Sequence, residues 1–350
     1  MINLKTQKIG KTEKPFIIAE MSGNHNQSLD RALSIVDAAA NAGAHAIKLQ
    51  TYTADTMTLD IKDGEFYIDD PKSLWKGQAM HDLYKLAYTP WEWHKPIMEH
   101  AKSKKLLCFS TPFDETAVDF LETLNVPAYK IASFECVDLP LIKKAASTKK
   151  PLIISTGMAS ITEITEAVDA ARSAGCKDLI LLKCTSTYPA SPENTNLQTI
   201  SHMRDLFACE VGLSDHTLGI GAAVAAVAIG ATVIEKHFTL SRADGGVDSA
   251  FSLEPGELAS LVSETERAHQ ALGSISYGFT EAEKGSLSRR RSLYIGENMK
   301  SGEILTPKNL RRVRPGNGLL PKYYESLLGK RVKFDVSKGT PVSWDIILDK

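Results

Sequence analysis

The sequence predicts an α/β protein whose larger part is a (β/α)8 TIM barrel, followed by a small C-terminal domain. Short apolar runs recur eight times over about 270 residues, with helical spacing in the segments between them. Polar residues end most of these runs, as at the mouth of a parallel barrel. Eight evenly spaced repeats favour a closed barrel over an open sheet.

The predicted strands each hold five to eight residues, a usual strand length. In chain order they are Pro15–Glu20, Ala46–Gln50, Leu106–Thr111, Ala128–Ser133, Pro151–Thr156, Leu179–Ser186, Glu210–Ser214 and Thr232–Phe238. Ser28 and Ser160 are placed as helix N-caps, and Gly43 and Gly175 as C-terminal glycines.

The spacing of the elements divides the chain into three parts. We expect the barrel over residues 1–275, a linker over 276–288 and a second domain over 289–350, with β-like pieces at Ser292–Ile295 and Pro341–Trp344. One long insertion, Thr51–Pro90, follows the second strand. It is rich in Tyr, Trp, Asp and Lys, which suits a loop over a site.

Composition excludes some functions. The chain has 350 residues, 43% of them hydrophobic, and a formal net charge of −1, so we expect neither nucleic acid nor a membrane surface as a partner. The polar, lysine-rich start, Met1–Lys14, lacks the apolar region of a signal peptide. Five scattered cysteines without a C-x-x-C pair suggest reduced thiols, and the expected location is the cytoplasm.

Two histidines mark the seventh and eighth strands. His216 and His237 end consecutive runs joined by the small-residue helix Gly219–Gly230, which together form a right-handed βαβ unit. Parallel strands end at the same edge, so both imidazoles can converge and bind a divalent metal. Two hydrogen-bonded core histidines are the alternative that this pattern leaves open.

Lysines and hydroxyl groups also lie at the ends of the predicted strands. They include Lys48, Lys130, Lys183, Lys236, Ser110, Thr111, Ser133, Ser155, Thr156, Ser186 and Ser214. Ammonium and hydroxyl groups around one mouth suit a ligand with phosphate and carboxylate groups. Any single lysine is more simply explained as a solvated side chain. Because polar residues recur at the ends of most strands, the pattern as a whole favours a ligand-binding site.

At these residues the chain resembles the sialic acid synthase family. The resemblance rests on Ile17–Glu20, Ile47–Gln50, Ser110–Phe113, Tyr129–Glu135, Ser155–Met158, Lys183–Pro189, Gly212–Thr217 and Val233–Phe238. Members of this family condense phosphoenolpyruvate with a six-carbon amino sugar. The loop Arg314–Gly318 resembles part of the family's antifreeze-like (SAF) domain, so the resemblance covers nearly the whole chain.

The resemblance implies a role for each matching residue. The implied phosphoenolpyruvate ligands are Lys48, Thr111, Lys130, Ser133, Ser155, Ser186 and Ser214; the implied metal ligands are His216 and His237, with manganese the usual ion. Glu20, Glu135 and Asp248 are the implied catalytic carboxylates, while Gln50, Tyr188 and Arg314 face the sugar. The family's domain-swapped homodimer implies that Arg314 reaches the partner's site. Which carboxylate is acid or base stays open.

Within the family, three stretches indicate which sugar is used. Lys48–Thr53, Ala132–Glu135 and Asp248–Leu253 are most similar to the branch that uses 2,4-diacetamido-2,4,6-trideoxy-altropyranose. Ser186 replaces the Asn of N-acetylneuraminate synthases, and Val247 replaces the Pro of their Gly-Pro-Asp motif. N-acetylneuraminate or legionaminate synthesis is the nearer alternative.

Two alternatives belong to other classes. One is a Schiff-base aldolase on the same barrel, with Lys48, Lys130 or Lys236 as the nucleophile. The other is a binding protein built around the terminal domain, which leaves the histidine pair unexplained.

Overall fold

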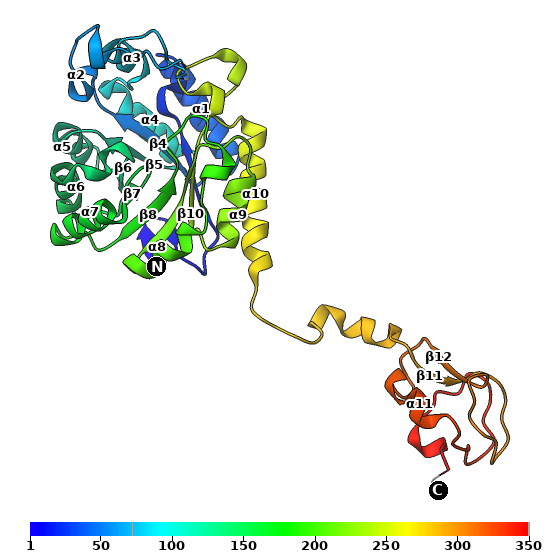
Figure 1. The fold of residues 1–350 in the computed structure, drawn as a ribbon. Helices are drawn as coiled ribbons and strands as arrows, with labels where there is room; N and C mark the ends of the chain where they lie inside the picture. Colours follow the sequence, from blue (N-terminus) through cyan, green and yellow to red (C-terminus); the bar gives the residue numbers. More distant parts are fainter. Residues whose placement is uncertain (72, 349–350) are drawn as a thin grey trace. The chain divides into compact units, whose positions relative to one another are not determined.

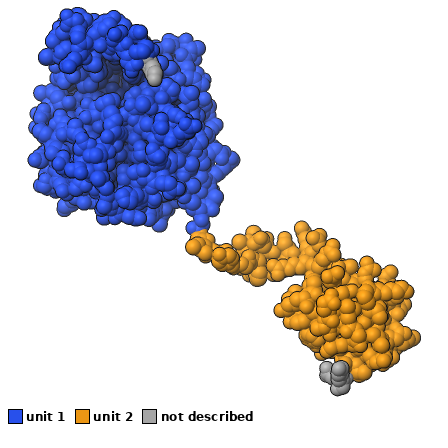
Figure 2. All heavy atoms as spheres, in the orientation of Figure 1, with its two compact units in different colours: residues 1–273 blue, residues 274–350 orange. Residues whose placement is uncertain are grey.

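The computed structural model describes residues 1–71 and 73–348, which form two compact units, Met1–Gly273 and Ser274–Lys350 (Figure 2). The first unit is the predicted barrel. Its eight parallel strands close in the order β10-β3-β4-β5-β6-β7-β8-β9. The strands are β3 (Phe16–Glu20), β4 (Ala46–Thr51), β5 (Leu107–Pro112), β6 (Tyr129–Ile131), β7 (Leu152–Ser155), β8 (Leu179–Cys184), β9 (Glu210–Asp215) and β10 (Val233–His237).

Helices surround the strands (Figure 1). They are α1 (Leu29–Asn41), α4 (Trp91–Ser103), α5 (Glu115–Thr123), α6 (Leu139–Ser147), α7 (Ile161–Ser173), α8 (Thr199–Phe207), α9 (Gly221–Ala228) and α10 (Pro255–Leu272). The predicted N-caps are confirmed, because Ser28 accepts a hydrogen bond from the Arg31 amide and Ser160 forms a capping box with Glu163. Gly43 and Gly175 follow their helices with φ of 86° and 103°.

Two apolar layers hold the barrel together. One lies between strands and helices, and the other fills the interior through alternate strand residues such as Phe16, Ile18 and Phe109. An N-terminal hairpin, β1 (Ile2–Leu4) and β2 (Gln7–Ile9), adds Ile2, Leu4 and Ile9 to this interior layer. The sequence analysis did not predict this hairpin, because its six residues mix apolar and polar side chains too briefly to show a period.

The insertion after β4 contains two short helices, α2 (Ala54–Met57) and α3 (Met80–Ala87). The second unit has its own core around Leu293, Leu310 and Val332. In this unit β11 (Ser292–Ile295) pairs with β12 (Leu310–Val313), and α11 (Tyr324–Leu327) follows. The β-like piece predicted at Pro341–Trp344 is short: Pro341 forms an isolated bridge with Tyr294, and the Val342 amide donates to the Leu293 carbonyl at 2.9 Å.

Candidate active site

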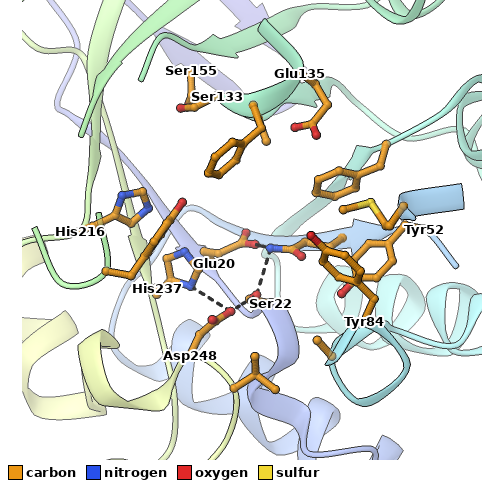
Figure 3. A pocket seen from close by; sticks show the side chains of 18 of the residues that line it. Glu20, Ser22, Tyr52, Tyr84, Ser133, Glu135, Ser155, His216, His237 and Asp248 are labelled. Carbon is orange, nitrogen blue, oxygen red and sulfur yellow. Dashed lines mark hydrogen bonds and ion pairs between the residues drawn. The ribbon is translucent and has the colours of Figure 1, made fainter. Parts of the chain in front are cut away.

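A cavity of about 610 Å³ opens at the carboxyl ends of the barrel strands. Most of the predicted site residues line it: Glu20, Lys48, Gln50, Lys130, Ser133, Glu135, Ser155, Tyr188, Ser214, His216, His237 and Asp248. Figure 3 shows that the side chains of His216, His237, Glu20, Glu135 and Asp248 surround one space. The structure therefore brings together residues that lie up to 228 positions apart along the chain.

Three predicted residues lie outside the cavity lining. Thr111 is buried beside it and accepts a hydrogen bond from Lys48 Nζ at 3.0 Å. Ser186 contacts Cys184 Sγ at 3.7 Å, just behind the wall. Arg314 is exposed in the second unit.

The two-residue period of the strands decides which lysines face the cavity. Lys48 and Lys130 point into the barrel. Lys236 points outward, where its Nζ binds Asp215 Oδ2 at 2.9 Å and two backbone carbonyls. Lys183, outside the lining, donates to the Cys184 carbonyl. A Schiff base from Lys236 therefore has no geometric support.

Four buried charged side chains form the floor of the cavity. Lys48 Nζ lies 2.7 Å from Glu20 Oε2 and 3.9 Å from Glu235 Oε2. Lys130 Nζ lies 3.7 Å from Glu235 Oε1 and donates to Ser155 Oγ at 2.6 Å. Burial opposes the charge on Glu235, but Lys130 and Lys48 outweigh it and lower the pKa of Glu235. Glu20 and Glu235 raise the pKa of Lys48 against the effect of burial, whereas burial lowers the pKa of Lys130.

Backbone and hydroxyl donors converge at one side of the floor. The Gly157 amide donates to Ser133 Oγ at 3.1 Å. A β-carbon at Gly157 would lie 2.2 Å from Ser186 Oγ and 2.8 Å from Ser133 Oγ, so only glycine fits. Ser133, Ser155 and Ser186 therefore crowd around one turn next to the Lys130 ammonium, a suitable cradle for an anion.

The two histidines meet at the other side. Their ring centroids are 5.3 Å apart, and the Tyr188 ring lies 4.5 Å from that of His216. His216 Nδ1 lies 3.0 Å from the Thr185 carbonyl, which leaves its Nε2 free. Among the described residues, the buried His237 Nδ1 has no hydrogen-bond partner, and Asp248 Oδ2 is 3.8 Å away.

A hydrogen-bonded chain connects the carboxylates to this pair. Gln50 Nε2 donates to Glu20 Oε1 at 2.8 Å and to Ser22 Oγ at 3.0 Å. Ser22 in turn donates to Asp248 Oδ2 (Figure 3). Burial raises the pKa of Asp248, and it raises the pKa of Glu20 to about 7 despite the adjacent Lys48. Burial also raises the pKa of Glu135 to about 7. Glu20 and Glu135 can thus exchange protons near neutral pH.

Comparison with known proteins identifies the family. Residues 35–277 match the NeuB family and residues 290–348 match the SAF domain. The chain belongs to the NeuB family. The resemblance seen in the sequence and the predicted fold class are both confirmed.

Relatives of this NeuB-family chain match it over nearly their whole length. The chain is 44% identical over 330 residues to the pseudaminic acid synthase of Campylobacter jejuni, covering 93% of this chain and 95% of that protein. It is 37% identical over 325 residues to the N,N'-diacetyllegionaminic acid synthase of C. jejuni, covering 91% and 96%. The crystal structure of N-acetylneuraminic acid synthetase from Leptospira borgpetersenii, in complex with citrate, has a TM-score of 0.73 and 35% identity over 82% of this chain and 94% of that chain.

The histidine pair fits a divalent metal. Metal-binding histidines usually give their second ring nitrogen to a carbonyl or carboxylate, as His216 does to Thr185. The unpartnered His237 Nδ1 is the second feature expected of a ligand set. The pKa of His237 is well below its usual value, because burial and His216 disfavour the imidazolium, and neutral imidazole is the metal-binding form.

A second cluster in this NeuB-family chain, formed by Asp60, His81 and Asp82, also has metal-binding residue types. Lys62 Nζ already occupies it, 2.8 Å from Asp60 Oδ1 and 2.5 Å from Asp82 Oδ1. His81 Nε2 lies 2.8 Å from Asp55 Oδ1. Because an ammonium neutralises the exposed carboxylates, this cluster lacks the charge and space that a cation needs.

Sequence reasoning did not assign four cavity residues that the structure adds. No role was predicted for Glu235, although it lies two residues before His237 on the same strand and so had to face inward as well. Ser22 lies two residues after Glu20 and could have been found from its place just after the strand. Tyr52 and Tyr84 come from the insertion, whose inward side chains show no period.

Proposed function

We propose that the chain is a pseudaminic acid synthase, which condenses phosphoenolpyruvate with 2,4-diacetamido-2,4,6-trideoxy-altropyranose. The products are pseudaminic acid and phosphate. The observation that carries the sugar assignment is the higher identity to a pseudaminic acid synthase than to the legionaminic acid enzyme of the same organism. Synthesis of legionaminate or N-acetylneuraminate stays the alternative to be tested.

The floor of the cavity suits phosphoenolpyruvate. Lys48 and Lys130 provide two ammonium groups in a buried setting, where charge pairing is strong. The cradle around Gly157 adds the hydroxyls of Ser133, Ser155 and Ser186. Ser214 completes the group, with its hydroxyl donating to Glu235 Oε1 at 3.1 Å. Thr111 acts through Lys48, which it positions by a hydrogen bond.

His216 and His237 would hold the divalent metal, for which we propose manganese. When bound, such an ion polarises the aldehyde oxygen of the open-chain sugar as a Lewis acid. The chain's own residues then orient the reactants, since the lysines fix the phosphoenolpyruvate anion while Gln50 and Tyr188 border the space for the sugar.

The reaction needs two proton movements. The methylene carbon of phosphoenolpyruvate bonds to the aldehyde carbon, whose oxygen takes up a proton. Water adds to C2 of phosphoenolpyruvate and gives up a proton, and the C2–O bond breaks with its electron pair leaving on phosphate. Glu20, Glu135 and Asp248 are the proposed proton carriers: burial raises the pKa of all three, and the values of about 7 for Glu20 and Glu135 suit transfer near pH 7.

The second unit is proposed to act on the active site of a partner subunit. Residues 274–350 hold 15 Lys and Arg but only 8 Asp and Glu, whereas the whole chain has 41 and 42. The two units therefore carry opposite net charges, which favours docking of a terminal unit on a barrel. Arg314, exposed in this basic unit, is the proposed sugar contact in a domain-swapped homodimer.

No helix in residues 1–71 and 73–348 is long and apolar enough to cross a membrane. All five cysteines, Cys108, Cys136, Cys176, Cys184 and Cys209, are free thiols. We propose a cytoplasmic location, where free thiols stay reduced.

A panel of sugars tests the function. The protein is incubated with phosphoenolpyruvate, manganese and one of three sugars: the proposed altropyranose, the legionaminate precursor or N-acetylmannosamine. Mass spectrometry should detect pseudaminic acid as the dominant product, and 18O in the bridging position of phosphoenolpyruvate should leave with phosphate. Comparable rates on N-acetylmannosamine would refute the sugar assignment, and label in the sugar acid would refute C–O cleavage.

A further inference from the structure

One wall of the cavity is mainly apolar and comes from the insertion between β4 and α4. Its apolar side chains include Met57, Ile68, Met80 and Leu83, with the rings of Tyr52 and Tyr84 beside them, and Thr56 and Ser73 of the insertion also line the cavity. Figure 3 shows Tyr52 and Tyr84 across the pocket from His216 and His237. The cavity therefore has a charged end at the barrel floor and an apolar end under the insertion.

Two phenol hydroxyl groups interrupt this apolar wall. Tyr52 is held by edge-to-face packing on Tyr84 at 5.8 Å and on Phe113 at 5.2 Å between ring centroids. Within the described part of the chain, neither the Tyr52 nor the Tyr84 hydroxyl has a hydrogen-bond partner. A buried tyrosine usually has one. Burial raises the pKa of both phenols, so both remain donors at neutral pH.

Hydrogen-bond donors beside aliphatic and thioether side chains suit one kind of substituent. An acetamido group presents a carbonyl oxygen that accepts a hydrogen bond and a methyl group that must be packed. A deoxy carbon presents a second methyl group. A hexose hydroxyl, by contrast, would lose water on entering this wall without gaining enough partners.

The ends of the cavity fix the direction in which the sugar lies. Its aldehyde carbon, C1, must lie at the charged end, near Lys48 and the histidines, where phosphoenolpyruvate is held. The C2 substituent, one bond away, stays near that end. Only the distal substituents, on C4 and C6, can reach the wall under the insertion.

We propose that Tyr52 and Tyr84, together with Met57, Met80 and Leu83, form a subsite for the C4 acetamido group and the C6 methyl group. This subsite rests on the proposed function and explains how the chain would select a diacetamido-trideoxy sugar. The tyrosine hydroxyls donate to the acetamido carbonyl, and the apolar side chains pack against the two methyl groups. These five residues are specificity residues and take no part in bond making.

Steady-state kinetics with three sugars test the subsite. They are the diacetamido-trideoxy sugar, its analogue with hydroxyl at C4 and its analogue with hydroxymethyl at C6. Tyr84→Phe removes one donor and keeps the ring. It should lower kcat/KM about tenfold for the first sugar but leave the 4-hydroxy analogue unchanged. Leu83→Asn should reduce the preference for methyl over hydroxymethyl at C6 by about tenfold.

Leu86→Asn is the matched control, because Leu86 lies on the same helix, α3, but is 57% exposed and outside the cavity. This variant should leave the ratios of kcat/KM among the three sugars unchanged. Thermal unfolding of each variant monitors its fold, and Tyr84→Phe keeps the test decisive if Leu83→Asn is unstable. Equal losses by Tyr84→Phe on the first sugar and on the 4-hydroxy analogue would overturn the subsite. A wild-type protein inactive on the first sugar would instead overturn the proposed function.

Discussion

Replacing Glu135 by Gln should stabilise the ligand-free protein at alkaline pH. Burial raises the pKa of Glu135 from 4.5 to about 7, and its Oε2 has no partner in the described residues. Between these values the folded chain keeps a proton that the unfolded chain has lost. Stability therefore falls as pH rises from 4.5 to about 7 and is constant above that.

The size of the effect follows from the pKa shift. One pKa unit corresponds to about 1.4 kcal/mol, so the full shift would cost about 3 kcal/mol above pH 7. The side chain is half-buried, and solvent screening reduces the expected cost to about 2 kcal/mol. Because glutamine cannot ionise, the variant avoids this cost.

Thermal unfolding at pH 5.5, 7.0 and 8.5 measures the loss of stability that the ionisation of Glu135 causes. The Tm of Glu135→Gln relative to wild type should rise by about 2 °C across the series, because part of the loss already occurs between pH 4.5 and 5.5. Glu193→Gln, in an exposed 3-10 helix, is the control and should show no such trend. If the Tm of Glu135→Gln and that of wild type depended on pH in the same way, the proposed cost of ionising Glu135 would be refuted. Turnover by Glu135→Gln should fall, since it can no longer carry a proton.

Three further predictions concern the metal, the lysines and the second unit. His216→Ala and His237→Ala should each lose bound manganese, measured by elemental analysis, and most turnover, with Tm nearly unchanged; full activity after verified chelation would exclude a metal role. Borohydride with pyruvate or sugar should leave no covalent adduct on Lys48 or Lys130, as judged by mass spectrometry, whereas an aldolase would be trapped. Mixing inactive Arg314→Ala with inactive His216→Ala protein should restore activity, because one site of each mixed dimer lacks both defects. No recovery after demonstrated subunit exchange would count against contact in trans.

Much of the barrel could be predicted because each strand is a short apolar run with a polar end. The ends of the strands agree with the structure to within one or two residues, as for the strand ending at Glu20. It was harder to predict which side chains of a strand point into the barrel and which point outward. Lys236 and Glu235 are neighbours at one strand end, yet only Glu235 faces the cavity. Side chains two residues apart on a strand face the same side, so counting back from His237 would have predicted that Glu235 faces the cavity and Lys236 does not.

The apolar wall could not be predicted from the sequence. Residues 52–71 and 73–88 form short helices and turns, so the side chains that meet in the cavity follow neither helical nor strand spacing. Tyr52 and Tyr84 lie 32 positions apart and touch only because the insertion folds over the barrel mouth. Contacts of this kind depend on tertiary structure alone.

The charge balance of the floor links ligand binding to proton uptake. Without ligand, Lys48 and Lys130 face Glu20 and Glu235, so two ammonium groups meet two carboxyl groups. At the proposed site, phosphoenolpyruvate would add several negative charges beside the same lysines. The buried Glu20, whose pKa is already about 7, would then be the group to take up a proton, because like charges raise a carboxyl pKa further. A divalent cation held by the two histidines would supply further positive charge, so that the two lysines, a protonated Glu20 and the metal would together balance the charge of the ligand.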